Sequence, residues 1–187
     1  VVGGVNFYSR KEIKDVLAYF RLVVNNNDND AFLRIINYPA RGIGQTSLDR
    51  LKIAADSMNC SLFDAASSDS LSQFGIKSST ASTLSDFCAF IRACSVELYN
   101  EDALTLGEKI IKRSRLKETI SEEDKAESKD RLENVEELIS GLQSFVSLED
   151  NSLIDELTGE VVSLENRTLD VYLQQISLFS DIDTKDD

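Results

Sequence analysis

Apolar side chains recur at intervals of three and four residues along most of the chain. The clearest run comprises Ile13, Val16, Leu17, Phe20, Val23 and Val24. Such spacing gathers apolar side chains on one face of an α-helix, and several helices of this kind can bury those faces only against each other. Proline occurs only once, at position 39. We therefore predict a mainly α fold, an irregular multi-helix bundle.

Turn and capping residues predict where individual elements begin and end. Residues 1–8 are rich in β-forming side chains and suit a short N-terminal strand. Asp30 suits the start of a second helix that Pro39 ends, and Ser121 with Asp124 suits the start of a long charged helix up to residue 146. Further helices are expected near residues 13–24, 46–58, 62–66, 79–98, 104–113 and 169–178.

The length and the cysteine content restrict the class of protein. With 187 residues, 42% of them apolar, the chain can build one compact domain or one domain with a small appendage. No apolar stretch approaches the roughly 20 residues that cross a bilayer. Three cysteines without a C-x-x-C pair suit small buried side chains in a reducing compartment, so we expect a cytoplasmic protein. The first residue is Val1 and the only methionine is Met58, so we also expect a piece of a longer protein.

Charge is distributed unevenly along the chain. The net charge is −13, which argues against nucleic-acid binding by overall attraction. Through residue 52, however, eight basic side chains face five acidic ones, and the remaining residues therefore carry −16. Any contact with phosphate is expected to be confined to a small patch near the start of the chain.

Missing residues and motifs exclude several kinds of chemistry. The chain has no histidine, the commonest general base and metal ligand, so catalytic triads and H-E-x-x-H zinc sites are excluded. No G-x-x-x-x-G-K-[ST] loop for nucleotide phosphates is present. The Asn/Asp run at 26–30 lacks the glycine and the glutamate of a calcium loop, and Asp181 with Asp183 suits a solvated acidic tail better than a metal site. We predict no metal and no catalytic residue in this chain.

One local pattern, Arg41 to Thr46 (RGIGQT), has the chemistry of a binding site. Glycines at alternate positions can adopt positive φ and turn successive amide N–H groups toward one point. A helix that starts directly afterwards adds its own free N–H groups and its dipole. This helix-hairpin-helix-like element suits DNA or RNA phosphate, with Ile43 as a buried anchor and with Arg41, Arg50 and Lys52 as added charge, although many glycine turns between helices are only turns.

Three segments in order resemble the UvrD/PcrA/Rep family of ATP-dependent DNA helicases. They are GGVNFYSRKEIKD at residues 3–15, LRIINYPARGIG at 33–44 and RLENVEEL at 131–138. The final LFSDID, at 178–183, is similar to the family segment that precedes its next helicase motif. Tyr38 and Ala40 stand where the family often carries other residues.

The resemblance implies a place for the chain in a larger motor of four subdomains, 1A, 1B, 2A and 2B. Residues 1–24 would be the C-terminal RecA-like (2A) flank, a strand and a helix. Residues 25–180 would form the helical accessory (2B) subdomain, and 181–187 an acidic linker back to 2A. ATP and Mg would bind elsewhere in the parent protein, which would be an ATP hydrolase, so this piece by itself is not expected to be catalytic.

By the same resemblance, the hairpin residues Gly42, Ile43, Gly44 and Thr46 would contact the backbone of duplex DNA, and Arg10 would lie beside the single strand. The parent would unwind DNA in the 3′ to 5′ direction, in repair or replication, with both DNA forms, the rest of the motor and repair or replication proteins as partners. The alternative is a protein-interaction or autoinhibitory helical module. The apolar stripe from Leu132 to Val146 would then dock a partner instead of packing in the core.

Overall fold

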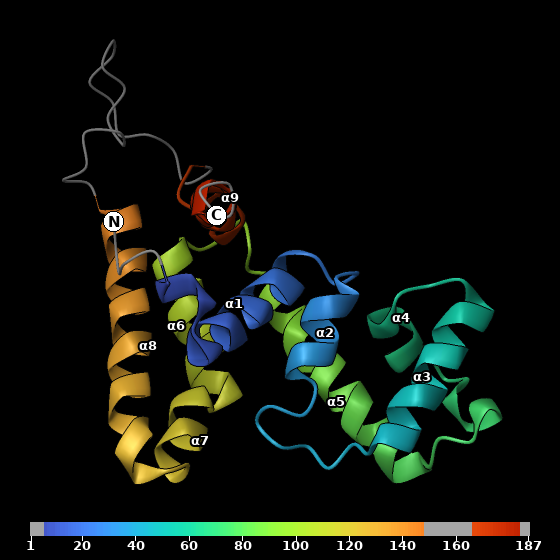
Figure 1. Cartoon of the computed structure of the whole chain (residues 1–187). Helices are drawn as coiled ribbons and strands as arrows, with labels where there is room; N and C mark the ends of the chain where they lie inside the picture. The colour runs from blue at the N-terminus through green and yellow to red at the C-terminus, as the bar shows by residue number, and fades with distance from the viewer. Residues whose placement is uncertain (1–5, 148–165, 184–187) are drawn as a thin grey trace.

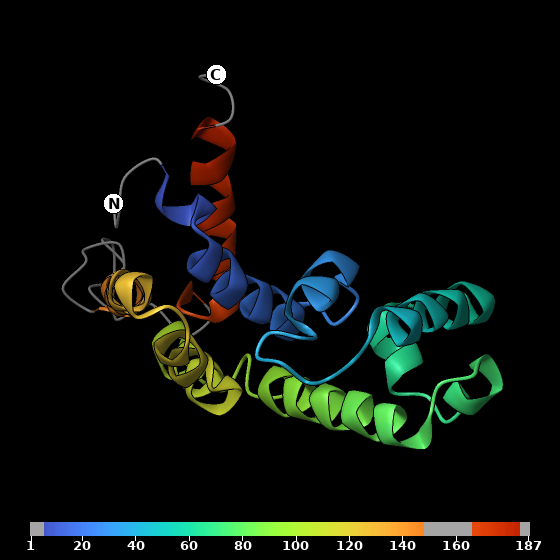
Figure 2. The same ribbon diagram turned by 60° about the horizontal axis from the view of Figure 1, so that its bottom comes forward.

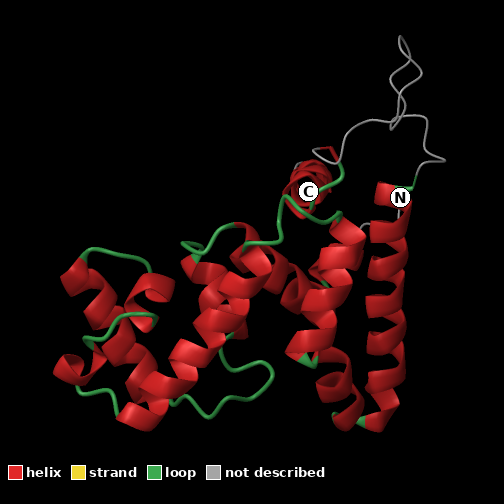
Figure 3. Ribbon diagram, turned by 180° about the vertical axis from the view of Figure 1, so that it is seen from behind, coloured by secondary structure: helices red, strands yellow, loops and turns green. Residues whose placement is uncertain are grey.

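The computed structural model describes residues 6–147 and 166–183, and within these ranges the chain is helical without any strand (Figures 1 and 3). The N-terminal part comprises η1 (Phe7–Ser9), α1 (Lys11–Val24), α2 (Asn29–Ile35), α3 (Gln45–Met58) and α4 (Leu62–Ala66). The rest comprises η2 (Leu71–Phe74), α5 (Ser78–Ser95), α6 (Ala103–Ser114), α7 (Leu116–Glu122), α8 (Lys125–Val146) and α9 (Leu169–Asp183). The prediction of a mainly α fold is confirmed.

The predicted N-terminal strand is not seen in the part of it that the structure describes. Asn6 lies in a turn, and Phe7–Ser9 form a 3₁₀-helix. The side chain of Phe7 is buried and stacks edge-on against Tyr8, with ring centroids 5.3 Å apart. This tight turn carries the chain directly into α1. Residues 1–5 of the predicted strand lie outside the described residues.

Helix α1 is the centre of the molecule. It packs against α2, α5, α6, α8 and α9, and all its apolar side chains except that of Val24 are at most 1% exposed. Neighbours on every side explain why its apolar face is wider than that of a surface helix. The predicted boundary after residue 24 stays a prediction.

The other helices form two groups around α1. Helices α6, α8 and α9 pack on α1, and α7 packs on α6 and α8, whereas α3, α4 and η2 gather at the opposite end of the molecule (Figures 1 and 2). Helix α5 extends between the two groups, as Figure 2 shows. One continuous apolar core links both groups.

The long apolar stripe of α8 belongs to this core. Val135, Leu138 and Leu142 are at most 1% exposed, and α8 packs on α1, α6 and α7. The centre of the stripe is therefore used inside the chain, whereas Leu132, Ile139, Phe145 and Val146 are half-buried.

Helix starts agree partly with the sequence. Asp124 caps α8, as predicted, by accepting a hydrogen bond from the Ala126 amide. The cap of α2 is Asp28, not Asp30, because the Asp28 carboxylate accepts from the Ala31 amide.

No helix in the described ranges has the length and apolar character needed to cross a membrane.

The three cysteines are free thiols. Cys88 and Cys94 are buried and Cys60 is half-buried, as expected for small apolar side chains. Burial raises the pKa of all three thiols, so they are held in the protonated, unreactive form.

Candidate functional site

The segment between α2 and α3 runs from Ile36 to Gly44 and contains the predicted hairpin. The Tyr38 amide donates to the Ile35 carbonyl and closes a turn at the end of α2, and the following peptide bond to Pro39 is cis. The chain then runs without regular structure through Ala40 and Arg41 to the start of α3 at Gln45. Figure 1 shows this segment as the long loop below α2.

Asn37 and Ile43 pin the two sides of the loop together. The Asn37 side-chain amide donates to the Ile43 carbonyl at 2.6 Å, and its oxygen accepts from the Ile43 amide at 3.0 Å. The Ile43 side chain is only 5% exposed, as its predicted role as an anchor requires. The same pairing occupies the Ile43 N–H, which is therefore not available to a ligand.

The two glycines of the loop differ in conformation. Gly42 has φ +73°, which a residue with a side chain adopts only at a cost, whereas Gly44 has φ −76° and is the N-cap of α3. Positive φ is therefore confirmed for Gly42 and wrong for Gly44. No atom lies within 4 Å of the position that a Cβ would take at either glycine, so both face open space.

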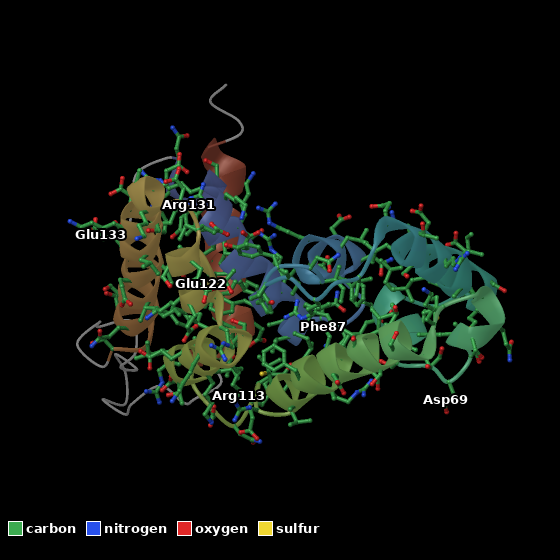
Figure 4. The ribbon with its side chains drawn as sticks, turned by 90° about the horizontal axis from the view of Figure 1, so that it is seen from below. Asp69, Phe87, Arg113, Glu122, Arg131 and Glu133 are labelled. Atoms are coloured by element: carbon green, nitrogen blue, oxygen red, sulfur yellow. The ribbon has the colours of Figure 1, made fainter. Side chains whose placement is uncertain are left out.

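Arg41 points into the protein, not toward solvent. Its Nη1 donates to the carbonyls of Ile35 and Ile36 at 2.7 and 3.0 Å, and its Nη2 donates to the Tyr19 hydroxyl at 2.8 Å. The guanidinium carbon also lies 4.5 Å from the centre of the Phe87 ring, which Figure 4 labels on α5. Arg41 thus bonds the Ile36 carbonyl, adds a second donor to the Ile35 carbonyl that already accepts from the Tyr38 amide, and holds the loop against α1 and α5.

The start of α3 remains open to a ligand. Gly44 has no side chain to cap the helix, and within the described residues no acceptor is bonded to the amide N–H groups of Gly44, Gln45 or Thr46. All three residues are exposed. Free N–H groups at a helix start, together with the helix dipole, attract an anion.

The predicted supporting charges are only partly present. Arg50 donates to the Gly75 carbonyl at 2.7 Å, so it links α3 to the turn after η2. Lys52 is exposed on α3. Local attraction for an anion therefore comes mainly from the backbone.

Arg10 lies away from the hairpin. It is the exposed N-cap residue of α1, and its Nη1 donates to the Asn134 side chain on α8 at 3.1 Å. Asn134 in turn donates to Glu12 at 2.7 Å. Two of the three segments that carry the family resemblance, which include Arg10 and Asn134, are thus in contact.

A family model, described as UvrD-like helicase C-terminal domain, matches residues 1–180. The chain belongs to this family. Two similar proteins are named ATP-dependent DNA helicase PcrA: that of Bacillus subtilis (strain 168) is 34% identical over 186 residues, and that of Staphylococcus aureus (strain Mu50) is 32% identical. Each alignment covers 100% of this chain but 23% of the relative, so the UvrD-like chain spans about a quarter of the PcrA proteins that it matches.

Metal binding has no support in the described part of this UvrD-like chain. No three carboxylate or thiol side chains gather there in a way that could hold an ion.

Sequence reasoning missed two residues that shape the loop of the UvrD-like chain. One is Asn37, whose side chain pairs with both backbone groups of Ile43; an asparagine just before the turn at Pro39 is the signal that could have revealed it. The other is Tyr19, which donates to the Tyr38 carbonyl and accepts from Arg41. Tyr19 lies within the apolar run of α1, and its pattern is that of an ordinary core residue.

Proposed function

We propose that this UvrD-like chain is the accessory 2B subdomain, with an adjoining part of 2A, of a cytoplasmic ATP-dependent DNA helicase, and that it holds duplex DNA through the hairpin at 41–46. The family match over residues 1–180 and the named function of the PcrA relatives support a helicase parent. ATP and Mg would bind in the remainder of that protein, where its ATPase activity would reside.

The exposed, uncapped start of α3 carries the proposal. The amides of Gly44, Gln45 and Thr46 have no acceptor among the described residues, and the loop before them is fixed by Asn37, Ile43 and Arg41. A phosphate could therefore bind without rearrangement of the loop, which reduces the entropy cost of binding. Arg41 does not contact the DNA in this proposal; its hydrogen bonds within the protein hold the loop in shape. Gly42, Gly44 and Thr46 face the DNA backbone.

In the proposed mechanism, the hairpin binds the duplex while the motor of the parent protein moves one strand. The motor pulls one strand in the 3′ to 5′ direction, past Arg10 on the single-strand side, while the hairpin holds or releases the incoming duplex. Backbone amides contact phosphate and not base edges, so binding is independent of sequence. Few phosphates are engaged, so the dependence of affinity on salt is shallow, with a slope of about −2 to −3 in log units.

A negative charge at the start of α3 tests the hairpin. In the full-length protein, Thr46→Glu should leave stability unchanged or raise it slightly, since a carboxylate at a helix start interacts favourably with the helix dipole. The same carboxylate repels phosphate, so duplex affinity should fall about tenfold or more. Fluorescence anisotropy with a labelled duplex measures the affinity, and urea unfolding measures the stability.

Ser79→Glu is the matched control. Ser79 is the second residue of α5, it is exposed, and α5 also begins without a side-chain cap. This variant adds the same charge at the same helical position, the second residue of an uncapped helix, and should bind duplex like the wild type. Unchanged affinity of Thr46→Glu, or an equal loss in both variants, would contradict the proposed contact.

A further inference from the structure

Tyr38, just before the hairpin, is hydrogen-bonded at both its backbone and the tip of its side chain. Its carbonyl accepts from the Tyr19 hydroxyl of α1 at 2.7 Å. Its own hydroxyl donates to Glu123 Oε1 at 2.7 Å, across 85 positions in the sequence. Glu123 is the residue that ends α7, at the turn into α8. Tyr38 therefore joins the loop to two elements that are distant from each other in the chain.

Glu123 is itself held in place. Its second oxygen accepts from Arg131 of α8 at 2.8 Å, and Arg131 also pairs with Glu127 at 2.7 Å. Figure 4 shows Glu133 of the same helix pointing away from the molecule, whereas Arg131 lies on the side toward α1. The carboxylate that receives the Tyr38 hydroxyl is thus oriented by a bridge within the α7–α8 turn.

The other side of the Tyr38 ring meets α1. Lys11 Nζ lies 3.9 Å from the ring centre, and Lys11 pairs with Asp15, which also binds Arg34 of α2 at 2.9 Å. Burial, and then the neighbouring Glu123, raise the pKa of Tyr38 above its ordinary value. The hydroxyl therefore remains a proton donor at neutral pH.

The contacts continue from Tyr38 into the hairpin. Tyr19, which binds the Tyr38 carbonyl, also accepts from Arg41, and Asn37, the residue before Tyr38, is paired with Ile43. An unbroken set of hydrogen bonds and peptide links thus connects Glu123 with the residues directly before the open start of α3.

We propose that Tyr38 is a positioning residue that fixes the hairpin relative to the α7–α8 turn through its hydrogen bond to Glu123. Tyr38 contacts no ligand in this assignment; it determines where the amides of Gly44 to Thr46 are presented. The effect on DNA binding rests on the proposed function, whereas the effect on the loop does not.

Tyr38→Phe is the direct test, because it keeps the ring under Lys11 and removes only the hydroxyl. In the full-length protein, hydrogen exchange of the two loop amides that have acceptors, those of residue 38 and Ile43, should become faster, roughly three- to tenfold, as the loop loses one tether. Tyr99→Phe is the matched control, since the Tyr99 side chain is 70% exposed, and it should change nothing. Unchanged exchange of these two amides in Tyr38→Phe would overturn the proposal without any DNA in the experiment.

Variants of Glu123, which accepts the hydrogen bond from the Tyr38 hydroxyl, provide a second test. Glu123→Gln keeps a side-chain oxygen that can accept from Tyr38 and should retain the protection of the Tyr38 and Ile43 amides. Glu123→Ala removes the acceptor and should behave like Tyr38→Phe, and the double variant Tyr38→Phe/Glu123→Ala should be no worse than either single one. Additive effects would show that the two residues act separately and would overturn the proposal.

Duplex affinity then links the loop to function. Tyr38→Phe should weaken duplex binding about three- to tenfold. When Tyr38→Phe is combined with Thr46→Glu, which already weakens the contact between the hairpin and DNA, it should not lower the duplex affinity further. A further loss in that background would show that Tyr38 acts outside the hairpin. Wild-type affinity of Thr46→Glu refutes the proposed function, whereas wild-type affinity of Tyr38→Phe beside a weak Thr46→Glu refutes only the positioning role.

Discussion

At the scale of single residues, Arg41 shows how one side chain can serve a binding loop without touching the ligand. Its three shortest hydrogen bonds go to Ile35, Ile36 and Tyr19, and its guanidinium stacks on Phe87. Burial raises the pKa of the Tyr19 hydroxyl, although the nearby Arg41 opposes this effect, so Tyr19 keeps its proton and can donate to Tyr38 while it accepts from Arg41.

Replacing Arg41 should therefore cost stability. We expect Arg41→Ala to lower the free energy of unfolding by about 2–4 kcal/mol, because several bonds to a charged donor are lost and the Ile36 carbonyl loses its Arg41 donor. Arg41→Lys should restore less than half of this, since an ammonium group cannot span the same acceptors or stack on the ring. Urea unfolding measures both variants, with the exposed Lys52→Ala as control. A fully stable Arg41→Ala would contradict this role.

At the scale of elements, the close packing of α6 depends on a glycine. A Cβ added at Gly107 would lie 2.9 Å from Leu142 Cδ1 of α8 and 3.3 Å from Phe20 Cζ of α1. Leu142 and Phe20 are both completely buried, so either side chain can make room only by repacking against its neighbours in the core. A helical glycine costs about 1 kcal/mol relative to alanine, so its presence here is explained by this contact and not by helix propensity.

Gly107→Ala should destabilise the protein by about 1–2 kcal/mol, because overpacking outweighs the gain in helix propensity. Leu142→Val removes the methyl group that the new Cβ meets, so the double variant should be more stable than the sum of the two single effects predicts. Glu108→Ala, at the exposed neighbouring position, is the control and should stay within about 0.5 kcal/mol of the wild type. Thermal and urea unfolding give the comparison; strictly additive effects would contradict the proposed clash.

At the same scale, helix α7 was not predicted: the predicted helices end near residue 113 and begin again at Ser121 with Asp124, whereas Ser121 lies within α7. Arg115 adopts φ +63° and separates α6 from α7, so that α7 packs separately on α8. Arginine is an ordinary helix former, and no glycine or proline marks the break. Leu116 and Ile120 are buried in the core, and the chain bends at Arg115 to place them there.

At the scale of the whole molecule, the titration of the chain follows from its composition and its burial. Without histidine, no side chain has an ordinary pKa near neutrality. Burial raises the pKa of the three cysteines and of Tyr8, Tyr19, Tyr38 and Tyr172. For such groups the folded state keeps a proton that the unfolded state releases, so stability is complete below the unfolded pKa and declines as pH rises above it.

We therefore expect the free energy of unfolding to be nearly constant between about pH 6.5 and 8, and to fall from about pH 9 upward as first cysteine and then tyrosine ionise in the unfolded chain. Tyr172→Phe should make the fall above about pH 10 less steep, because one raised pKa is removed. Urea unfolding across this pH series provides the test. An increase in stability above pH 9 would show that the sign is wrong.

The helices and the loop were predictable because their signals are local. Apolar spacing located α1, α3 and α8, and Pro39, Gly42 and Gly44 located the loop before α3. Each of these signals acts through backbone conformation or through helical periodicity within a few residues, and such effects do not depend on the rest of the fold.

Local patterns in the sequence thus predicted the helical class, the position of the loop before α3 and the burial of Ile43. Tertiary structure alone decided that Arg41 turns inward, that the α8 stripe faces the core, and that Tyr38 meets Glu123 across 85 positions. These outcomes depend on which helices become neighbours. Neighbours are selected by the summed packing of the whole core, and no local pattern of residues contains that information.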